Sequence, residues 1–251
     1  SLWLRHSLLI FPDQHLSTKE QIEFAKLFGV MEFDLAPISN VRSDGSIRDP
    51  VDDDVVKSLR GNMEWHHDST YMPIQAKGSV FTAHTVPADG GETGWADMTA
   101  AYEALDPKMK DKVEGLRAYH SYVYSQSKYK HKPQEESEFS GYGFDVDPHP
   151  FRPLVKTHSE TGRKSLLIGR HAYGIPGMNK EDSKALLDEL NDFACQGDRV
   201  YHHSWTPGDA VIWDNRNLMH QACPWDLNEA RVMYHSRIQG DASSESGLNY
   251  L

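Results

Sequence analysis

Apolar residues occur along this chain mostly in short runs, and polar or glycine-containing stretches separate these runs. Short apolar runs bounded by turn residues are typical of β-strands, whereas helices need longer stretches with apolar positions every three or four residues. Pro207-Gly208-Asp209, for example, is a turn sequence directly before an apolar run. The pattern predicts strands over residues 6–11, 79–86, 117–124 and 210–213, and a hairpin formed by residues 154–156 and 165–169.

Helix signals are fewer. Ser17-Thr18-Lys19-Glu20 is a capping-box sequence and predicts a helix that ends at Gly29. Asp97 and Asp106-Pro107 predict the starts of two shorter helices. Leucines at helical spacing predict the longest helix over residues 179–196.

Many short strands, few helices and no alternation of strands with helices favour a mostly β fold. We predict a double-stranded β-helix, the jelly roll of cupin-like proteins, with helices on its outside. A chain of 251 residues fits a single domain, residues 1–251, with a substantial core. We expect residues 44–54 to form an exposed loop. Residues 125–150 show little apolar periodicity and are a candidate active-site lid, with a plain surface loop as the alternative.

The net charge of −11 argues against nucleic acid or an anionic membrane as a partner. It does not exclude a small anionic substrate, because a local cluster of Arg and His can override the global sign. Cys195 and Cys223 lack the spacing of a metal site and are interpreted as reduced thiols of a cytoplasmic protein. No apolar run approaches transmembrane length and no signal peptide is visible, so we expect no membrane partner.

Candidate chemistry begins at Trp65-His66-His67-Asp68. On a strand, His66 and Asp68 would point to the same face and offer one imidazole nitrogen and one carboxylate oxygen to a metal ion. His67 would point to the other face. The spacing alone is weak, because 14 His and 37 acidic residues produce such pairs by chance, and His158-x-Glu160 is interpreted as part of a hairpin turn. A distant histidine such as His220 would complete a two-histidine, one-carboxylate site, which is typical of non-haem Fe(II) oxygenases.

Four segments together resemble the taurine / 2,4-dichlorophenoxyacetate dioxygenase family. They are the Trp-His-x-Asp segment, Gly90-Gly91-Glu92-Thr93, Trp213-Asp214-Asn215-Arg216 before His220, and Arg231 eleven residues after His220. The resemblance extends from about Leu8 to Gly240. Within the family the chain is most similar to the (S)-phenoxypropionate dioxygenases, through stretches such as Gly61-Asn62-Met63 and residues 165–178. Family members carry a further N-terminal strand, so we expect one to be missing here.

The resemblance implies Fe(II) as the metal, with 2-oxoglutarate and O2 as cosubstrates. It implies that His66, Asp68 and His220 are the iron ligands. Arg231, on the adjoining strand, would bind the far carboxylate of 2-oxoglutarate with its planar guanidinium. Thr93 would assist at the cosubstrate, and Trp213 would also lie there. Because the carboxylate ligand is present, the resemblance implies hydroxylation and not halogenation.

The substrate side departs from the family pattern. The taurine enzymes hold their sulfonate with an arginine four residues after the 2-oxoglutarate arginine, and that position is His235 here. Candidate residues for binding an anionic substrate are Asn62, Tyr71, Arg170, His171 and His235.

We therefore expect a 2-oxoglutarate-dependent dioxygenase that acts on a small anionic substrate. An aryloxyalkanoate would be hydroxylated next to its ether oxygen and split into a phenol and an oxo acid. The same chemistry on a sulfonate or an alkyl sulfate is one alternative. A metal-dependent jelly-roll enzyme without oxidative chemistry, or a binding module, is another. We also expect a homo-oligomer.

Overall fold

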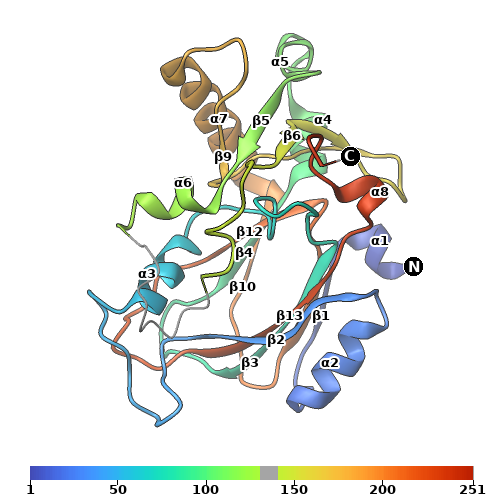
Figure 1. Cartoon of the computed structure of the whole chain (residues 1–251). Helices are drawn as coiled ribbons and strands as arrows, with labels where there is room; N and C mark the ends of the chain where they lie inside the picture. The colour runs from blue at the N-terminus through green and yellow to red at the C-terminus, as the bar shows by residue number, and fades with distance from the viewer. Residues whose placement is uncertain (131–140, 251) are drawn as a thin grey trace.

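Two antiparallel sheets form the centre of the structure, a computed structural model that describes residues 1–130 and 141–250. The larger sheet has the strand order β1 (Leu8–Phe11), β11 (Ala210–Asp214), β3 (Gly78–Thr85), β13 (Val232–Ile238) and β2 (Met31–Ser39). The smaller sheet has the order β10 (Val200–His203), β4 (Thr93–Asp97) and β12 (Leu218–Ala222). Strands distant in sequence are neighbours in both sheets (Figure 1), as in the predicted double-stranded β-helix, and the mostly β jelly-roll class is confirmed.

Buried aromatic residues join the two sheets. Trp213 and Phe81 come from the larger sheet, and Trp95 comes from the smaller one. The Trp95 and Trp213 ring centroids lie 5.9 Å apart in an edge-to-face arrangement, the geometry that aromatic pairs prefer. This shared core explains why short strands with little surface of their own form a stable barrel.

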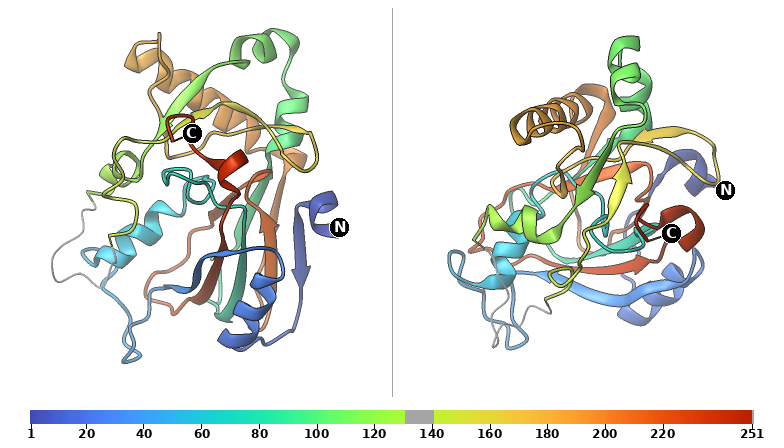
Figure 2. Two further views of the ribbon diagram at one scale, coloured as in Figure 1. Left: turned by 45° about the vertical axis from the view of Figure 1, so that its right-hand side comes forward. Right: turned by 45° about the horizontal axis from the view of Figure 1, so that its top comes forward.

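The predicted helices are confirmed, because their starts are encoded by local hydrogen bonds. Ser17 and Glu20 form the complete capping box of α2 (Thr18–Lys26). Asp97 and Asp106 accept hydrogen bonds from the first turns of α4 (Met98–Ala104) and α5 (Pro107–Val113). Asn179 caps α7 (Lys180–Ala194) in the same way. Helix α2 packs against the larger sheet, whereas α5 and α7 lie together at one end of the molecule in all views (Figures 1 and 2).

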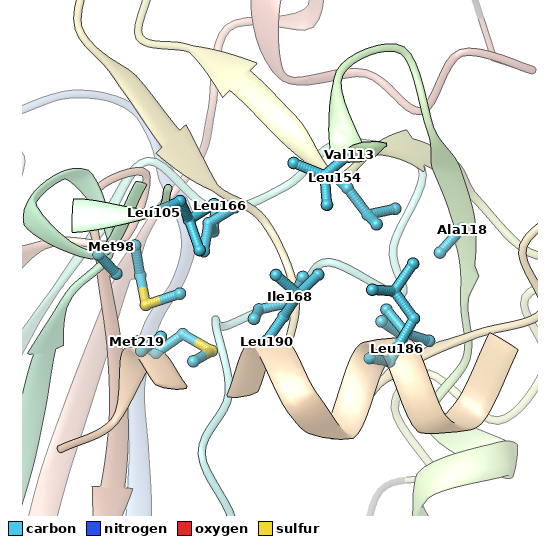
Figure 3. Packing of buried hydrophobic residues seen from close by; sticks show 14 of the residues in the cluster. Met98, Leu105, Val113, Ala118, Leu154, Leu166, Ile168, Leu186, Leu190 and Met219 are labelled. Atoms are coloured by element: carbon cyan, nitrogen blue, oxygen red, sulfur yellow. The ribbon is translucent and has the colours of Figure 1, made fainter. Parts of the chain in front are cut away.

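The leucines of α7 fill a second core outside the barrel. Leu190 lies next to Ile168, Leu186 lies on the side of Ala118 and Val113, and Met98 of α4 and Met219 of β12 lie on the opposite side of the same cluster (Figure 3). This cluster supports β12, the strand that also carries His220. Among the described residues, no helix combines the length and the apolar character needed to cross a bilayer.

Two predicted strands are shorter than expected, because a serine caps or ends a helix next to each one. Residues 117–124 form β5 (Arg117–His120) and then α6 (Tyr122–Ser127), whose N-cap Ser121 accepts a hydrogen bond from the Tyr124 amide. In residues 6–11, the first residue belongs to α1 (Leu2–His6). Ser7 then ends that helix in a left-handed conformation, with φ 58°.

The remaining strands form two small sheets that are separate from the two central ones. Strand β5 pairs with β6 (Phe151–Pro153) and β9 (Ala172–Tyr173), and the predicted hairpin is formed by β7 (Val155–Thr157) and β8 (Lys164–Leu166). A 3-10 turn covers Gly197–Arg199, and α8 (Ala242–Glu245) lies near the C-terminus.

The predicted exposed loop, residues 44–54, is partly wrong. Asp53 caps α3 (Asp54–Gly61), a helix that the sequence pattern did not indicate, and accepts hydrogen bonds from the Val55 and Val56 amides. Arg48 is buried and lies 3.4 Å from the Asp53 carboxylate. The middle of the loop therefore folds inward. The predicted lid, residues 125–150, begins inside α6, and its residues 131–140 lie outside the part that the structure describes.

Candidate active site

A cavity of about 670 Å³ lies between the two sheets. Phe81, Trp213 and His235 line it from the larger sheet, and Thr93 and His220 line it from the smaller one. Both sheets of the barrel thus contribute side chains to one cavity, as expected of a jelly-roll enzyme.

His66, Asp68 and His220 meet in this cavity. Their potential ligand atoms all lie within 4.8 Å of one another, and all three residues are buried. The strand expected around His66 is absent. Instead His66 forms a single β-bridge with His220, with backbone N–O distances of 3.0 and 2.8 Å, and the chain then turns at Ser69, where φ is 54°. This bridge brings the two imidazoles together, with ring centroids 4.2 Å apart.

The protonation states of the three side chains suit a metal ion. Burial lowers the pKa of His66 well below its usual value and that of His220 to about 4, so both imidazoles are neutral at pH 7. His66 Nδ1 lies 2.7 Å from the Glu64 carbonyl oxygen, to which it can donate, and this leaves Nε2 as the ligand atom. Burial alone would raise the pKa of the Asp68 carboxyl, but Arg237, His220 and His235 hold it well below its usual range. Two neutral imidazoles and one carboxylate fit a non-haem divalent ion.

His67 faces away from this group. Its Nδ1 lies 2.7 Å from the Asn215 carbonyl oxygen, and the side chain is fully buried. Asn215 also bonds the backbone of Asp68 in both directions, from Asp68 N to Asn215 Oδ1 at 2.7 Å and from Asn215 Nδ2 to Asp68 O at 2.9 Å. His67 and Asn215 therefore fix the backbone that presents Asp68.

Arg237 is a residue of this site that sequence reasoning missed. Its Nη2 donates to Asp68 Oδ1 at 2.9 Å and its Nη1 to Ser69 Oγ at 3.0 Å, while Ser79 Oγ donates to Asp68 Oδ2 at 3.0 Å. The carboxylate is thus held from both sides. The alternation of a strand could have indicated this residue, because Arg237 follows Arg231 and His235 at even spacing and so shares their face.

Arg231 lies at another part of the cavity wall. It directly precedes β13, which belongs to the larger sheet, so it is not on a strand adjoining the β12 strand of His220, as had been expected. Its Nε and Nη2 donate to the Gly91 carbonyl oxygen at 3.2 and 3.1 Å. A Cβ at Gly91 would lie 3.2 Å from Arg231 Nε, so glycine permits this close approach. Burial lowers the pKa of Arg231 to about 10, and the guanidinium is still charged at pH 7.

Thr93 and Trp213 line the same cavity as Arg231. Thr93 Oγ1 accepts a hydrogen bond from Trp205 Nε1 at 3.0 Å, which orients the hydroxyl. The Trp213 ring lies 4.8 Å from the His220 ring and is stacked against the His235 ring at 5.7 Å. Trp213 therefore contacts the metal-site histidine directly and also joins the two sheets.

The five candidate substrate residues divide into two groups. Asn62, Tyr71, His171 and His235 line the cavity, and Arg170 does not. His171 lies beside the metal site, with its ring 5.8 Å from that of His66 and its Nδ1 2.9 Å from Ser125 Oγ. His235 Nε2 lies 3.5 Å from Asp68 Oδ2 and has no hydrogen-bond partner among the described residues, so this histidine lies beside the metal site without being bonded there.

Arg170 is buried directly behind the cavity wall. Its guanidinium lies 5.8 Å from the ring of the cavity residue Tyr122 and against Gly61, where an added Cβ would be 2.1 Å from Nη1. None of its three guanidinium nitrogens has a hydrogen-bond partner among the described residues. Burial lowers the pKa of this guanidinium. The guanidinium lies near Glu64 and the Tyr122 ring, but its hydrogen-bond donors are unused among the described residues, so it can bind an anion.

The chain is similar to known proteins in both sequence and structure. A model of the taurine catabolism dioxygenase TauD, TfdA family matches residues 1–237. The chain is 60% identical over 248 residues to an (S)-phenoxypropionate/alpha-ketoglutarate-dioxygenase of Sphingobium herbicidovorans, covering 98% of this chain and 86% of that protein. It is 54% identical to a protein of the same description from Delftia acidovorans, covering 97% and 86%. A crystal structure of AAD-2 in complex with Mn(II) and N-oxalylglycine matches with a TM-score of 0.87 and 34% identity, covering 98% and 87%.

Proposed function

The chain belongs to the TauD/TfdA family and is a 2-oxoglutarate-dependent dioxygenase, and from this premise we propose that it uses Fe(II) to hydroxylate a small aryloxyalkanoate. The carbon next to the ether oxygen is the proposed target. The hydroxylated carbon then loses the phenol and leaves an oxo acid. The single observation that favours an anionic substrate is the buried Arg170 guanidinium, which has no hydrogen-bond partner among the described residues.

We assign the metal to His66, Asp68 and His220, whose donor atoms and protonation states fit a divalent ion. Bound iron would allow O2 to convert 2-oxoglutarate into succinate and CO2 and to supply the oxidant for the substrate. Arg231 would bind the far carboxylate of 2-oxoglutarate through two parallel hydrogen bonds, because its orientation is already fixed by the Gly91 carbonyl. Thr93, oriented by Trp205, would donate its hydroxyl hydrogen to the cosubstrate, with Trp213 beside it.

We assign the substrate carboxylate to the side of the cavity where His171, Asn62 and Arg170 lie. His171 lines the cavity next to the metal site, and Arg170 supplies the permanent charge behind it. Tyr71 completes this side with its ring 4.7 Å from that of His171. His235 is less suited to hold a substrate anion, because it already faces the Asp68 carboxylate.

The test is succinate release with Fe(II), 2-oxoglutarate and O2 over a panel of aryloxyalkanoates, alkyl sulfates and sulfonates. We expect 2-phenoxypropionate to give succinate and phenol in equal amounts, and no phenol without O2. If succinate is released only with sulfates or sulfonates, the proposed type of reaction would be correct but the proposed aryloxyalkanoate substrate class would be wrong. Substrate turnover under strictly anaerobic conditions would instead indicate a non-oxidative metal enzyme.

A further inference from the structure

Aromatic rings form one continuous part of the cavity wall. Phe33, Tyr71, Tyr122 and Tyr142 all line the cavity. The Tyr71 ring lies 4.7 Å from the Tyr122 ring and 6.0 Å from the Tyr142 ring, and the Phe33 ring lies 6.3 Å from Tyr142. Since His171 connects Tyr71 to His66 through ring contacts of 4.7 and 5.8 Å, this wall lies next to the metal site.

Hydrogen bonds hold the Tyr142 ring in place, as the bonds of the Tyr122 hydroxyl to Ser58 and Gln126 also hold that ring. The Tyr142 hydroxyl donates to the Glu32 carboxylate and lies 3.3 Å from Ser69 Oγ. Ser69 in turn donates to Glu32 Oε1 at 2.9 Å. Glu32 and Ser69 thus fix the ring of Tyr142 beside the residue that follows Asp68.

The backbone after Tyr142 packs directly on the other rings. Gly143 has φ 85°, and a Cβ there would lie 2.5 Å from Tyr71 Cε2. Phe144 contacts Tyr122 edge-to-face, with centroids 5.1 Å apart. Residues 142–144 therefore close the aromatic wall instead of only passing near it.

The arrangement of the rings favours a flat aromatic occupant. Tyr71 and Phe33 meet Tyr142 at 78° and 87°, so the wall offers both faces and edges of rings, the partners that another aromatic ring prefers. A cationic occupant is disfavoured, because the Arg237 guanidinium already lies 4.8 Å from the Phe33 ring and 5.9 Å from the Tyr142 ring.

We propose that Tyr142 is a specificity-determining residue whose ring, positioned by Glu32 and Ser69, selects substrates with an aryl group over substrates with an alkyl group. This inference rests on the function proposed above and assigns the aryl part of the substrate to a defined side chain.

The test compares two acids of equal charge, 2-phenoxypropionate and 2-butoxypropionate, in the iron-loaded enzyme. Tyr142→Leu removes the ring but keeps apolar volume, and we expect it to raise the KM for the phenoxy acid about 10-fold while the KM for the butoxy acid changes less than about twofold. Tyr142→Phe keeps the ring and loses the hydroxyl, so its effect should be smaller and should match that of Glu32→Gln. The KM for 2-oxoglutarate and the affinity for Mn(II) should not change in Tyr142→Leu or Tyr142→Phe, whereas Glu32→Gln also removes a charge next to Arg237, so its Mn(II) affinity is measured separately.

Tyr129→Phe is the matched control. The Tyr129 hydroxyl donates to Glu64 Oε1 at 2.7 Å and not to Glu32, and Tyr129 does not line the cavity. This variant should leave both KM values unchanged. If Tyr142→Leu changes the KM for both acids equally, or changes neither, the inference is overturned. Activity of the wild type on the phenoxy acid would still support the proposed function in that case. If the wild type acts on the butoxy acid alone, both fail. If Tyr142→Leu does not fold, Tyr142→Phe and Glu32→Gln test the inference instead. In these variants the KM for the phenoxy acid should rise more than the KM for the butoxy acid.

Discussion

Replacing Gly61 by alanine tests the role of the buried Arg170 without removing its charge. Gly61 is the last residue of α3 and does not have a left-handed backbone, so alanine suits the position and adds up to about 1 kcal/mol of helix propensity. The new methyl carbon would lie 2.1 Å from Arg170 Nη1, whereas ordinary contacts begin at 3.4 Å. The guanidinium, which is the far end of a flexible side chain, must therefore shift by more than about 1 Å.

The expected loss follows from the hydrogen bond that we propose between the Arg170 guanidinium and the substrate carboxylate, for which the Tyr122 ring would have to move, since Arg170 itself does not line the cavity. A hydrogen bond between charged groups contributes roughly 1.5–3 kcal/mol, which corresponds to about 10- to 100-fold in affinity. We therefore expect Gly61→Ala to raise the KM for 2-phenoxypropionate by that factor, measured by succinate release. The KM for 2-oxoglutarate should stay constant, because its proposed binding residue, Arg231, lies at another part of the cavity wall. The melting temperature should change by less than about 4 °C.

A double-mutant cycle supplies the control. Arg170→Met keeps most of the apolar stem and removes the guanidinium, and alone it should raise the substrate KM by the same 10- to 100-fold. Adding Gly61→Ala to this variant should then have no further effect, because the group that it displaces is gone. An unchanged KM in Gly61→Ala, or the same loss in both backgrounds, would refute the assignment of the substrate anion to Arg170.

Three further predictions concern the metal and the cosubstrate. Asp68→Ala and His220→Ala should abolish Mn(II) binding in a calorimetric titration while the fold survives, and His67→Ala should retain most of the binding. If His67→Ala abolished Mn(II) binding and Asp68→Ala retained it, His67 and not Asp68 would be a metal ligand. Arg231→Lys should weaken 2-oxoglutarate binding about 10- to 100-fold, because lysine cannot make the planar two-point contact, and a change confined to the substrate constant would contradict the assignment. Arg237→Lys keeps the charge but cannot reach both Ser69 and Asp68, so Mn(II) binding should weaken about 10-fold; an unchanged metal affinity with a raised substrate KM would place Arg237 in substrate binding.

The parts of the fold that depend on local signals could be predicted from the sequence. Ser17 and Asn179 each accept a hydrogen bond from an amide three residues away, so the start of a helix is encoded within one turn. The strand after Pro207-Gly208-Asp209 is likewise marked by its own turn. By contrast, Tyr122-Val123-Tyr124 has the composition of a strand, and its helical state depends on Ser121 and on burial of Tyr122 in the tertiary structure.

The candidate site was predictable only where the residues form a recognisable motif. His66, Asp68, His220 and Arg231 were found because their spacing resembles a family. Tyr142 and Glu32 were missed, since their hydrogen bond joins positions 110 residues apart and neither position has a distinctive neighbourhood in sequence. The inward fold of Arg48 was missed for a similar reason, because charge and glycine made its segment look exposed. Long-range contacts of this kind leave no periodicity that a single sequence could show.

The charges around the cavity would explain how a chain with a net charge of −11 could bind the two proposed anions at once. Arg237 donates directly to Asp68 and cancels the charge of the carboxylate ligand. In the proposed complex the two positive charges of a divalent ion, the one of Arg231 and the one of the buried Arg170 then remain, against the three negative charges of 2-oxoglutarate and a monocarboxylate substrate. A neutral substrate would increase this excess of positive charge in a buried site, at a high cost in free energy. Selectivity for anions would thus follow from Arg170 together with the pairing of Arg237 with Asp68.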